Sequence, residues 1–399
     1  MRRRALAWGS PSERRDADLF LADLFGRPSR QHLREWSDPV PEFDHDPPPR
    51  VFDPEASDEL VEVCGFFGPN DVRRTEQEIR NAVVARANAE WAQWHPAGVP
   101  RPETDAALFG RLVNYYLAQN ADIAPDHLTA LQAAALGTIN YTPLLSANTV
   151  TGVRDALITA AAVPNTTTMK SHVAEGLRHA REANQNTGTT FASWSAVFVV
   201  SCVRGAAIAL GLEAVIGSPR RHIGKNELLL ATIRHSQYAR EARIRRAARR
   251  RGTYHAFTPA EREPQPGDII VLDRQASAVA SVTTLAALPE KLKTHGDIIV
   301  EVAPTFVVTI GGNLTSPTLP AIGESARKRR YPRNAQGFLL VDPPQLFTQE
   351  DDTAALAALP RTSTASLHDH STARIFALLK PVEECAAVPG QPYKGGVLT

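Results

Sequence analysis

The spacing of the hydrophobic residues changes once along the chain, and this change limits the fold more than any other feature. Between residues 60 and 185 apolar side chains recur at steps of three or four, the period of amphipathic helices. Further along, short runs rich in β-branched residues occupy 269–272, 297–302 and 306–310. Helices followed by strands joined through short turns predict an α+β fold with an antiparallel sheet.

Predicted helices cover most of the first half of the chain. The first follows a capping-box sequence at 75–78, and a later one follows Ser193, a good N-cap residue, and runs from Trp194 to Leu212. The helix after the capping box covers about 76–94, and others are expected near 108–117, 125–131, 150–162, 168–184 and 225–250. Weaker strand signals lie at 338–341 and 374–379.

The overall composition excludes several classes of protein. Lys and Arg total 44 against 43 Asp and Glu in 399 residues, so the net charge of +1 favours neither nucleic acid nor a membrane surface as an obligatory partner. The three cysteines lack any paired spacing, which argues against a disulfide framework or a cysteine metal site. No apolar run is long enough to span a bilayer, and the basic start has no signal-peptide core. We therefore expect synthesis in the cytoplasm without a signal peptide.

Residue types suited to nucleophilic catalysis occur at three separate positions. Ser195 lies in the first turn of a predicted helix, where unpaired backbone N–H groups and the helix dipole favour negative charge. His295 begins one predicted strand and Asn313 follows the next, so pairing of the two strands brings them together. His295 would take the serine proton, while Asn313 or Asp297, which shares a strand face with His295, would orient the ring. Alternatively, Ser195 is the polar end of a buried helix stripe.

Five short motifs follow one another in a specific order. They are Trp-Ser-Ala-Val-Phe-Val at 194–199, His-Ser-Gln-Tyr at 235–238, Pro-Gly-Asp at 266–268, His-Gly-Asp-Ile-Ile-Val at 295–300 and Gly-Gly-Asn at 311–313. In this order they resemble a bacterial family known as domain of unknown function 2272, which is similar to the NlpC-like and CHAP-like cell-wall peptidases. The resemblance covers roughly 170–345.

The resemblance implies a papain-like fold, in which the nucleophile helix packs on an antiparallel sheet. It also implies a hydrolase that cleaves amide bonds in peptidoglycan stem peptides or cross-links without metal or cofactor. Ser195 falls where those enzymes have cysteine, His295 on their histidine and Asn313 on their third polar residue. The residues expected to bind substrate are Trp194, His235, Tyr238 and Gly312.

A serine in place of cysteine leaves three interpretations open. A serine hydroxyl needs a competent base, whereas a thiolate forms readily beside a histidine. Ser195 is therefore a working nucleophile, a mark of a module that has lost its chemistry, or a replacement made to trap an inactive form. In the second case the chain is a catalytically inactive papain-like module that binds cell wall or forms part of a secretion apparatus.

These inferences give a predicted domain organisation and cellular context. The domains are an arm, partly disordered, at 1–50, a helical extension at 51–169, the catalytic domain at 170–345 and a C-terminal extension at 346–399. A cell-wall substrate without a signal peptide suggests export to the periplasm by a dedicated machine, as for an antibacterial toxin of the type VI secretion kind. Its partners would be peptidoglycan and an immunity protein or a secretion-apparatus component.

The remaining charged clusters favour simpler interpretations. The basic runs at 240–251 and 327–330 are typical of cations at a helix end or of a rim that attracts anions. They lack the interleaved aromatic residues expected of a nucleic-acid platform. The short His/Asp clusters at 44–46 and 368–370 are more typical of solvated turns than of metal sites.

Overall fold

A computed structural model describes residues 76–185, 193–212, 228–229, 231–247, 253–273, 294–315, 324–341 and 374–382. Chain contacts place all of them in one unit, Asp58–Thr399. The predicted arm at 1–50, the start of the capping box at 75 and the clusters at 44–46 and 368–370 lie outside the described residues. Within the described part, none of the helices has the length and hydropathy needed to cross a bilayer.

Helices fill the first half of the described chain, and no strand interrupts residues 76–185. The predicted helices near 76–94, 150–162 and 168–184 are confirmed within a few residues at their ends. The helical elements are α4 (Glu76–Trp94), η1 (Pro96–Gly98), η2 (Ala106–Leu108), α5 (Phe109–Ala118), α6 (Pro125–Ala135), α7 (Thr142–Ala147), α8 (Val150–Ala160), α9 (Thr167–Asn184), α10 (Ser195–Ala209) and α11 (His235–Ala247).

The described strands form one six-stranded antiparallel sheet in the order β1-β6-β2-β3-β4-β5. This confirms the α+β class. β6 comes from the segment set apart above as a C-terminal extension, yet it pairs between β1 and β2 inside the sheet. The strands are β1 (Thr253–Phe257), β2 (Ile269–Asp273), β3 (Thr294–Val302), β4 (Phe306–Thr315), β5 (Glu324–Pro332) and β6 (Arg374–Val382).

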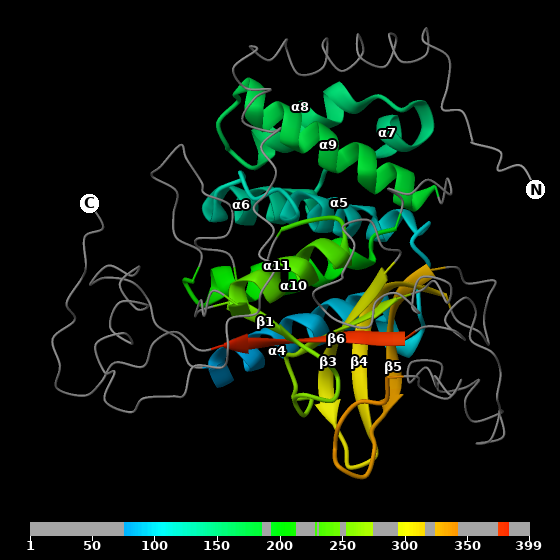
Figure 1. The fold of residues 1–399 in the computed structure, drawn as a ribbon. Helices are drawn as coiled ribbons and strands as arrows, with labels where there is room; N and C mark the ends of the chain where they lie inside the picture. The colour runs from blue at the N-terminus through cyan, green and yellow to red at the C-terminus, as the bar shows by residue number, and fades with distance from the viewer. Residues whose placement is uncertain are drawn as a thin grey trace, which may run out of the picture. The chain divides into compact units, whose positions relative to one another are not determined.

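Side chains on the two faces of the sheet enter different clusters. Ile269 and Val271 of β2 belong to the large core shared with the helices, whereas Ile270 and Leu272 belong to a smaller cluster on the opposite face. α4 and α10 contact the sheet, α5 packs on α10, and α6 and α9 pack on α5. Figure 1 shows these layers, with α7, α8 and α9 farthest from the sheet. The apolar core therefore runs from the sheet through successive layers of helices.

The predicted hairpin is formed by β3 and β4. Its register runs from Ile298↔Ile310 to Val302↔Val307. Beyond this ladder β4 bulges between Gly311 and Leu314, where Asn313 has a left-handed backbone with φ of 60°. The bulge turns the end of β4 toward the start of α10, which contacts both strands of the hairpin.

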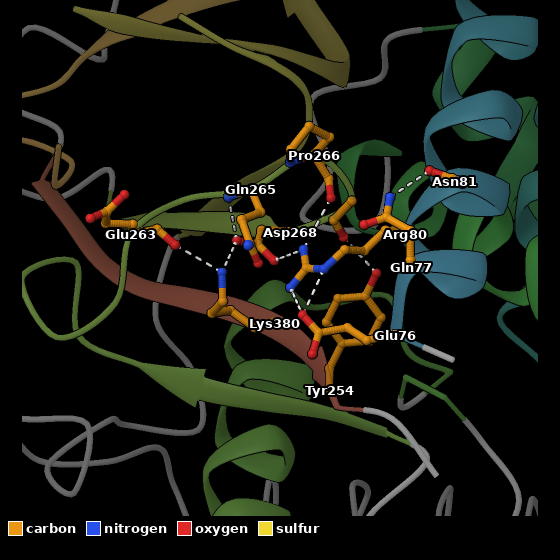
Figure 2. Close-up of polar contacts among 11 residues, drawn as sticks. Glu76, Gln77, Arg80, Asn81, Tyr254, Glu263, Gln265, Pro266, Asp268 and Lys380 are labelled. Carbon is orange, nitrogen blue, oxygen red and sulfur yellow. Dashed lines mark hydrogen bonds and ion pairs between the residues drawn. The ribbon is translucent and has the colours of Figure 1, made fainter. Parts of the chain in front are cut away.

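The Pro-Gly-Asp turn before β2 is held by residues from both ends of the described chain. The buried carboxylate of Asp268 accepts hydrogen bonds from Lys380 Nζ of β6 at 2.6 Å and from the backbone N–H of Gln265 at 2.8 Å. Arg80 of α4 pairs with the same carboxylate and also donates to the Pro266 carbonyl at 3.0 Å (Figure 2). α4 and β6 thus fix the turn that opens the central strand.

Three strand predictions and one surface prediction are corrected. β1 and β5 were not expected as strands, and residues 338–341 contribute only an isolated bridge between Arg333 and Leu339. The basic run 327–330 lies in β5, where Arg327 and Arg329 are buried, so these two side chains cannot form a solvated rim for anions. In the other basic run Arg245 is also buried, and residues 248–251 lie outside the described part.

Candidate active site

Ser195 is the first residue of α10, and Trp194 is its N-cap residue. The cap has no side-chain hydrogen bond of its own. Instead, the backbone N–H of Trp194 donates to Asn313 Oδ1 at 2.8 Å. The expectation that Ser193 caps this helix is therefore wrong. The amide oxygen of Asn313, predicted to orient His295, is used to hold the start of the helix at the β4 bulge.

The hydroxyl group of Ser195 has a histidine partner, but it is not the predicted one. Ser195 Oγ lies 2.7 Å from Nε2 of His235, the first residue of α11, and it makes no hydrogen bond to His295. On the other side of the His235 ring, Nδ1 hydrogen-bonds the hydroxyl group of Tyr238. His235 and Tyr238, predicted as substrate-binding residues, instead form a chain that starts at Ser195.

This chain is compatible with the protonation pattern that a base requires. If Nε2 of His235 accepts the Ser195 proton, Nδ1 carries the ring hydrogen and donates it to the oxygen of Tyr238. Burial, followed by the negative charge of Asp297, raises the pKa of Tyr238 well above its usual value, so this phenol stays neutral. The spacing of three residues that brings His235 and Tyr238 onto one helix face was the sequence signal for their pairing.

His295 forms a second pair with Asp297, as predicted for one of its two candidate partners. His295 Nε2 lies 2.7 Å from Asp297 Oδ1. The other carboxylate oxygen accepts hydrogen bonds from Tyr331 at 2.7 Å and Thr309 at 3.3 Å. Burial alone would raise the pKa of Asp297, but the charge and hydrogen bond of His295, the nearby Arg329 and the Tyr331 hydroxyl together lower it. Asp297 is therefore a buried, ionised carboxylate.

The two histidine pairs lie side by side. The ring centroids of His235 and His295 are 5.5 Å apart, with an angle of 48° between their planes. His295 thus neighbours the base of Ser195 rather than serving as that base itself. Docking of α11 against β3 creates this arrangement, and no local sequence pattern specifies it.

Two glycines of the quoted motifs make room for these contacts. A Cβ atom at Gly296 would lie 2.4 Å from the Tyr238 hydroxyl oxygen and 2.6 Å from His235 Nδ1. A Cβ atom at Gly311 would lie 1.7 Å from Asp297 Oδ1. The space beside Gly311 is therefore filled by the Asp297 carboxylate from the neighbouring strand.

Trp194 and Gly312 pack in the core instead of lining a substrate site. Trp194 is fully buried, stacks on Trp94 with centroids 4.6 Å apart, and donates its indole N–H to Glu103 at 2.6 Å. A Cβ atom at Gly312 would lie 2.5 Å from Cζ3 of Trp194. Both residues let the start of α10 pack closely on β4, and this packing positions Ser195 over the sheet.

The Ser195 hydroxyl group and the two histidine rings are almost completely buried. Ser195, His235 and His295 are 2%, 3% and 1% exposed. Ser193 is exposed, and its hydroxyl oxygen lies 3.3 Å from Ser195 Oγ, so solvent reaches within one hydrogen bond of the buried serine. The nearby thiol of Cys202 is fully buried, and burial raises its pKa, which makes it an unreactive core residue.

Chemically, the arrangement supplies a hydroxyl group, an imidazole in hydrogen-bond contact with it, and the first-turn backbone N–H groups of α10, which have no acceptor within the helix. Among the described residues, no group of three or more His, Cys, Asp or Glu side chains is placed to hold a metal ion. The described groups therefore suit nucleophilic and acid–base chemistry.

Comparisons with known proteins support the resemblance to the DUF2272 family and give no match to the peptidases. Residues 170–321 match a family described as an uncharacterized protein conserved in bacteria (DUF2272). No curated protein and no solved structure matches the chain. Ser195, the two histidines and both glycine motifs fall inside the matched segment, whereas α4 and β6 fall outside it. The chain therefore contains a DUF2272 domain at residues 170–321.

Proposed function

We propose that this chain is a hydrolase that cleaves an amide bond with Ser195 as the nucleophile. The observation that carries the proposal is the 2.7 Å hydrogen bond between Ser195 Oγ and His235 Nε2 at the first residue of α10. A serine hydroxyl attacks a carbonyl group only when a base takes its proton, and His235 is in position to do so.

The reaction follows from the roles of these groups. His235 Nε2 takes the Ser195 proton while Oγ forms a bond to the carbonyl carbon of the substrate. The negative charge that develops on the carbonyl oxygen is stabilised by the N–H of Ser195 and its neighbours in the first turn of α10. Nε2 then returns the proton to the leaving amine, and the C–N bond breaks. Water, activated by the same nitrogen, hydrolyses the acyl-enzyme and restores the serine.

Peptidoglycan stem peptides or cross-links are the proposed substrate. The support is the resemblance of the ordered motifs to NlpC-like and CHAP-like peptidases, together with a helix that starts at the candidate nucleophile and packs on an antiparallel sheet. We place the chain in a papain-like group on the same grounds. A base on α11 departs from the expected pattern, in which the strand histidine acts directly. On this proposal the protein is exported to act in the periplasm, and an immunity protein protects the producing cell.

The near-complete burial of Ser195 and both histidines favours a second candidate function. In this alternative the domain is a catalytically inactive module that binds cell wall or forms part of a secretion apparatus. The hydrogen bonds of the site would then serve only to join α10, α11 and β3. The two candidates differ in whether a substrate reaches Ser195.

Digestion of purified sacculi distinguishes them. The wild-type protein and a Ser201→Ala control, which alters a buried serine on the same helix, should release soluble fragments whose masses identify the cleaved bond. Ser195→Ala and His235→Ala should release none. Ser195→Cys should retain activity because a thiolate forms easily beside a histidine. Binding of sacculi without release of fragments by the wild type would favour the inactive module.

A further inference from the structure

The neighbouring histidines give the site a charge arrangement that a single serine–histidine pair lacks. His235 is held at both nitrogens, by Ser195 and by Tyr238. His295 is held by Asp297 at 2.7 Å, and its ring contacts that of His235. Any charge on the second pair is therefore felt by the ring that contacts Ser195.

The second pair contains an ionised carboxylate in a region without solvent. Asp297 is 0% exposed and His295 is 1% exposed. Water does not screen a charge at such a site, so a buried carboxylate requires a positive partner. The ring of His295 is in direct hydrogen-bond contact with this carboxylate, and Arg329 of β5 acts on it from farther away. When His295 is protonated, the pair is an imidazolium and a carboxylate whose charges cancel.

Other titratable groups lie on α11 and on the strands that it contacts, which are β1, β2, β3 and β6. On α11 itself Glu241 forms an ion pair with Arg245 at 3.0 Å. The titratable side chains of the contacting strands are Tyr254 and His255 of β1, Asp273 of β2, His295, Asp297 and Glu301 of β3, and Arg374 and Lys380 of β6. Of these, His295 is in ring contact with His235.

We propose that the His295–Asp297 pair is a charge-balanced positioning unit that sets the proton occupancy of His235. The inference deepens the proposed function, because a base must be unprotonated before it can take the Ser195 proton. With both charges present, the pair adds no net charge beside the neutral His235 ring that would attract a proton. If the imidazolium alone is removed, the remaining carboxylate favours a proton on His235, and Nε2 no longer accepts from Ser195.

The charge arrangement predicts opposite results for two kinds of variant. His295→Gln keeps a hydrogen-bond donor for Asp297 but removes the positive charge in direct contact with it, so His235 should be half protonated about one pH unit higher than in the wild type. The double variant His295→Gln, Asp297→Asn removes both charges and should return the midpoint close to the wild-type value. Asp297→Asn alone should leave it at or below the wild-type value.

NMR titration of the full chain labelled with ¹⁵N-histidine measures this occupancy directly. The His235 signals are assigned by their loss in His235→Gln, and their midpoints are read between pH 5 and 9. A cooperative thermal unfolding transition shows that each variant is folded. If His295→Gln does not fold, Asp297→Asn provides a separate test. Equal His235 midpoints in the wild type and His295→Gln would overturn the proposal. So would a double variant whose midpoint equals that of His295→Gln, or an Asp297→Asn variant whose midpoint lies above that of the wild type. The titration does not depend on catalysis, so failure in the sacculus assay with the expected titration would refute only the proposed function.

Discussion

Glu103 provides a sharp test of how the start of α10 is held. Its carboxyl group is 2% exposed and accepts the indole N–H of Trp194 at 2.6 Å. Burial, and then the charge of Glu324, raise its pKa from an ordinary 4.5 to about 8, although the hydrogen bond from Trp194 opposes this rise. At neutral pH the folded protein therefore keeps a proton on Glu103 that the unfolded chain releases.

The raised pKa determines how stability depends on pH. The folded state binds one more proton than the unfolded state between pH 4.5 and about 8. The stabilising contribution of Glu103 is therefore fully present below pH 4.5 and is lost as the pH rises through about 8. Glu103→Gln removes this dependence while its side-chain oxygen still accepts from Trp194. Relative to the variant, the wild-type free energy of unfolding should fall by up to about 1.4 kcal/mol per pH unit in that window.

Urea unfolding monitored by tryptophan fluorescence at several values from pH 4 to pH 9 measures the difference. The variant should be more stable than the wild type at pH 9, and the two stability curves should converge at low pH. Glu263→Gln is the matched control, because the Glu263 side chain is 64% exposed. Parallel curves for the wild type and Glu103→Gln across the whole range would refute the reasoning.

Three further predictions concern the frame around the candidate site. Gly311→Ala places a Cβ atom 1.7 Å from Asp297 Oδ1, so it should displace the carboxylate and abolish sacculus digestion; an active variant would show that this contact is dispensable. Arg80→Met leaves the buried Asp268 with Lys380 as its remaining cation, and urea unfolding should show a loss of about 3 kcal/mol, whereas no loss would contradict the role given to α4. The lowered pKa of Asp297 stabilises the fold above the ordinary aspartate pKa, and this contribution is lost as the pH falls through the lower folded-state value. Asp297→Asn should therefore flatten the acid side of the stability curve, and an unchanged acid side would count against an ionised carboxylate.

Local sequence patterns predicted those parts of the fold that follow from periodicity. The apolar stripe from Ile79 to Trp94 gives α4, and the β-branched runs after the Pro-Gly-Asp turn give β2 and the β3–β4 hairpin. β5 was missed as a strand because its buried positions include Arg327 and Arg329, so it lacks the alternation of apolar and polar residues. Arg327 makes a tertiary contact that no local pattern indicates, since its Nε donates to the Leu314 carbonyl of β4 at 3.0 Å.

The sequence predicted most of the residues of the candidate site but not the hydrogen bonds between them. Ser195 at a helix start and His295 beside Asp297 follow from local spacing. The Ser195–His235 contact depends on how α11 docks over Gly296, a packing event between distant segments. Asn313 was given the wrong partner for a similar reason, since the bulge in β4 turns its amide toward Trp194.

The central claim is that Ser195 is an activated nucleophile. Mass spectrometry of the intact protein after treatment with a small alkyl fluorophosphonate, followed by peptide mapping, tests it most directly. The account predicts one adduct, located on Ser195, that forms far more slowly in His235→Gln and at the normal rate in Ser201→Ala. No adduct on the wild type, or an adduct that persists in Ser195→Ala, would contradict it.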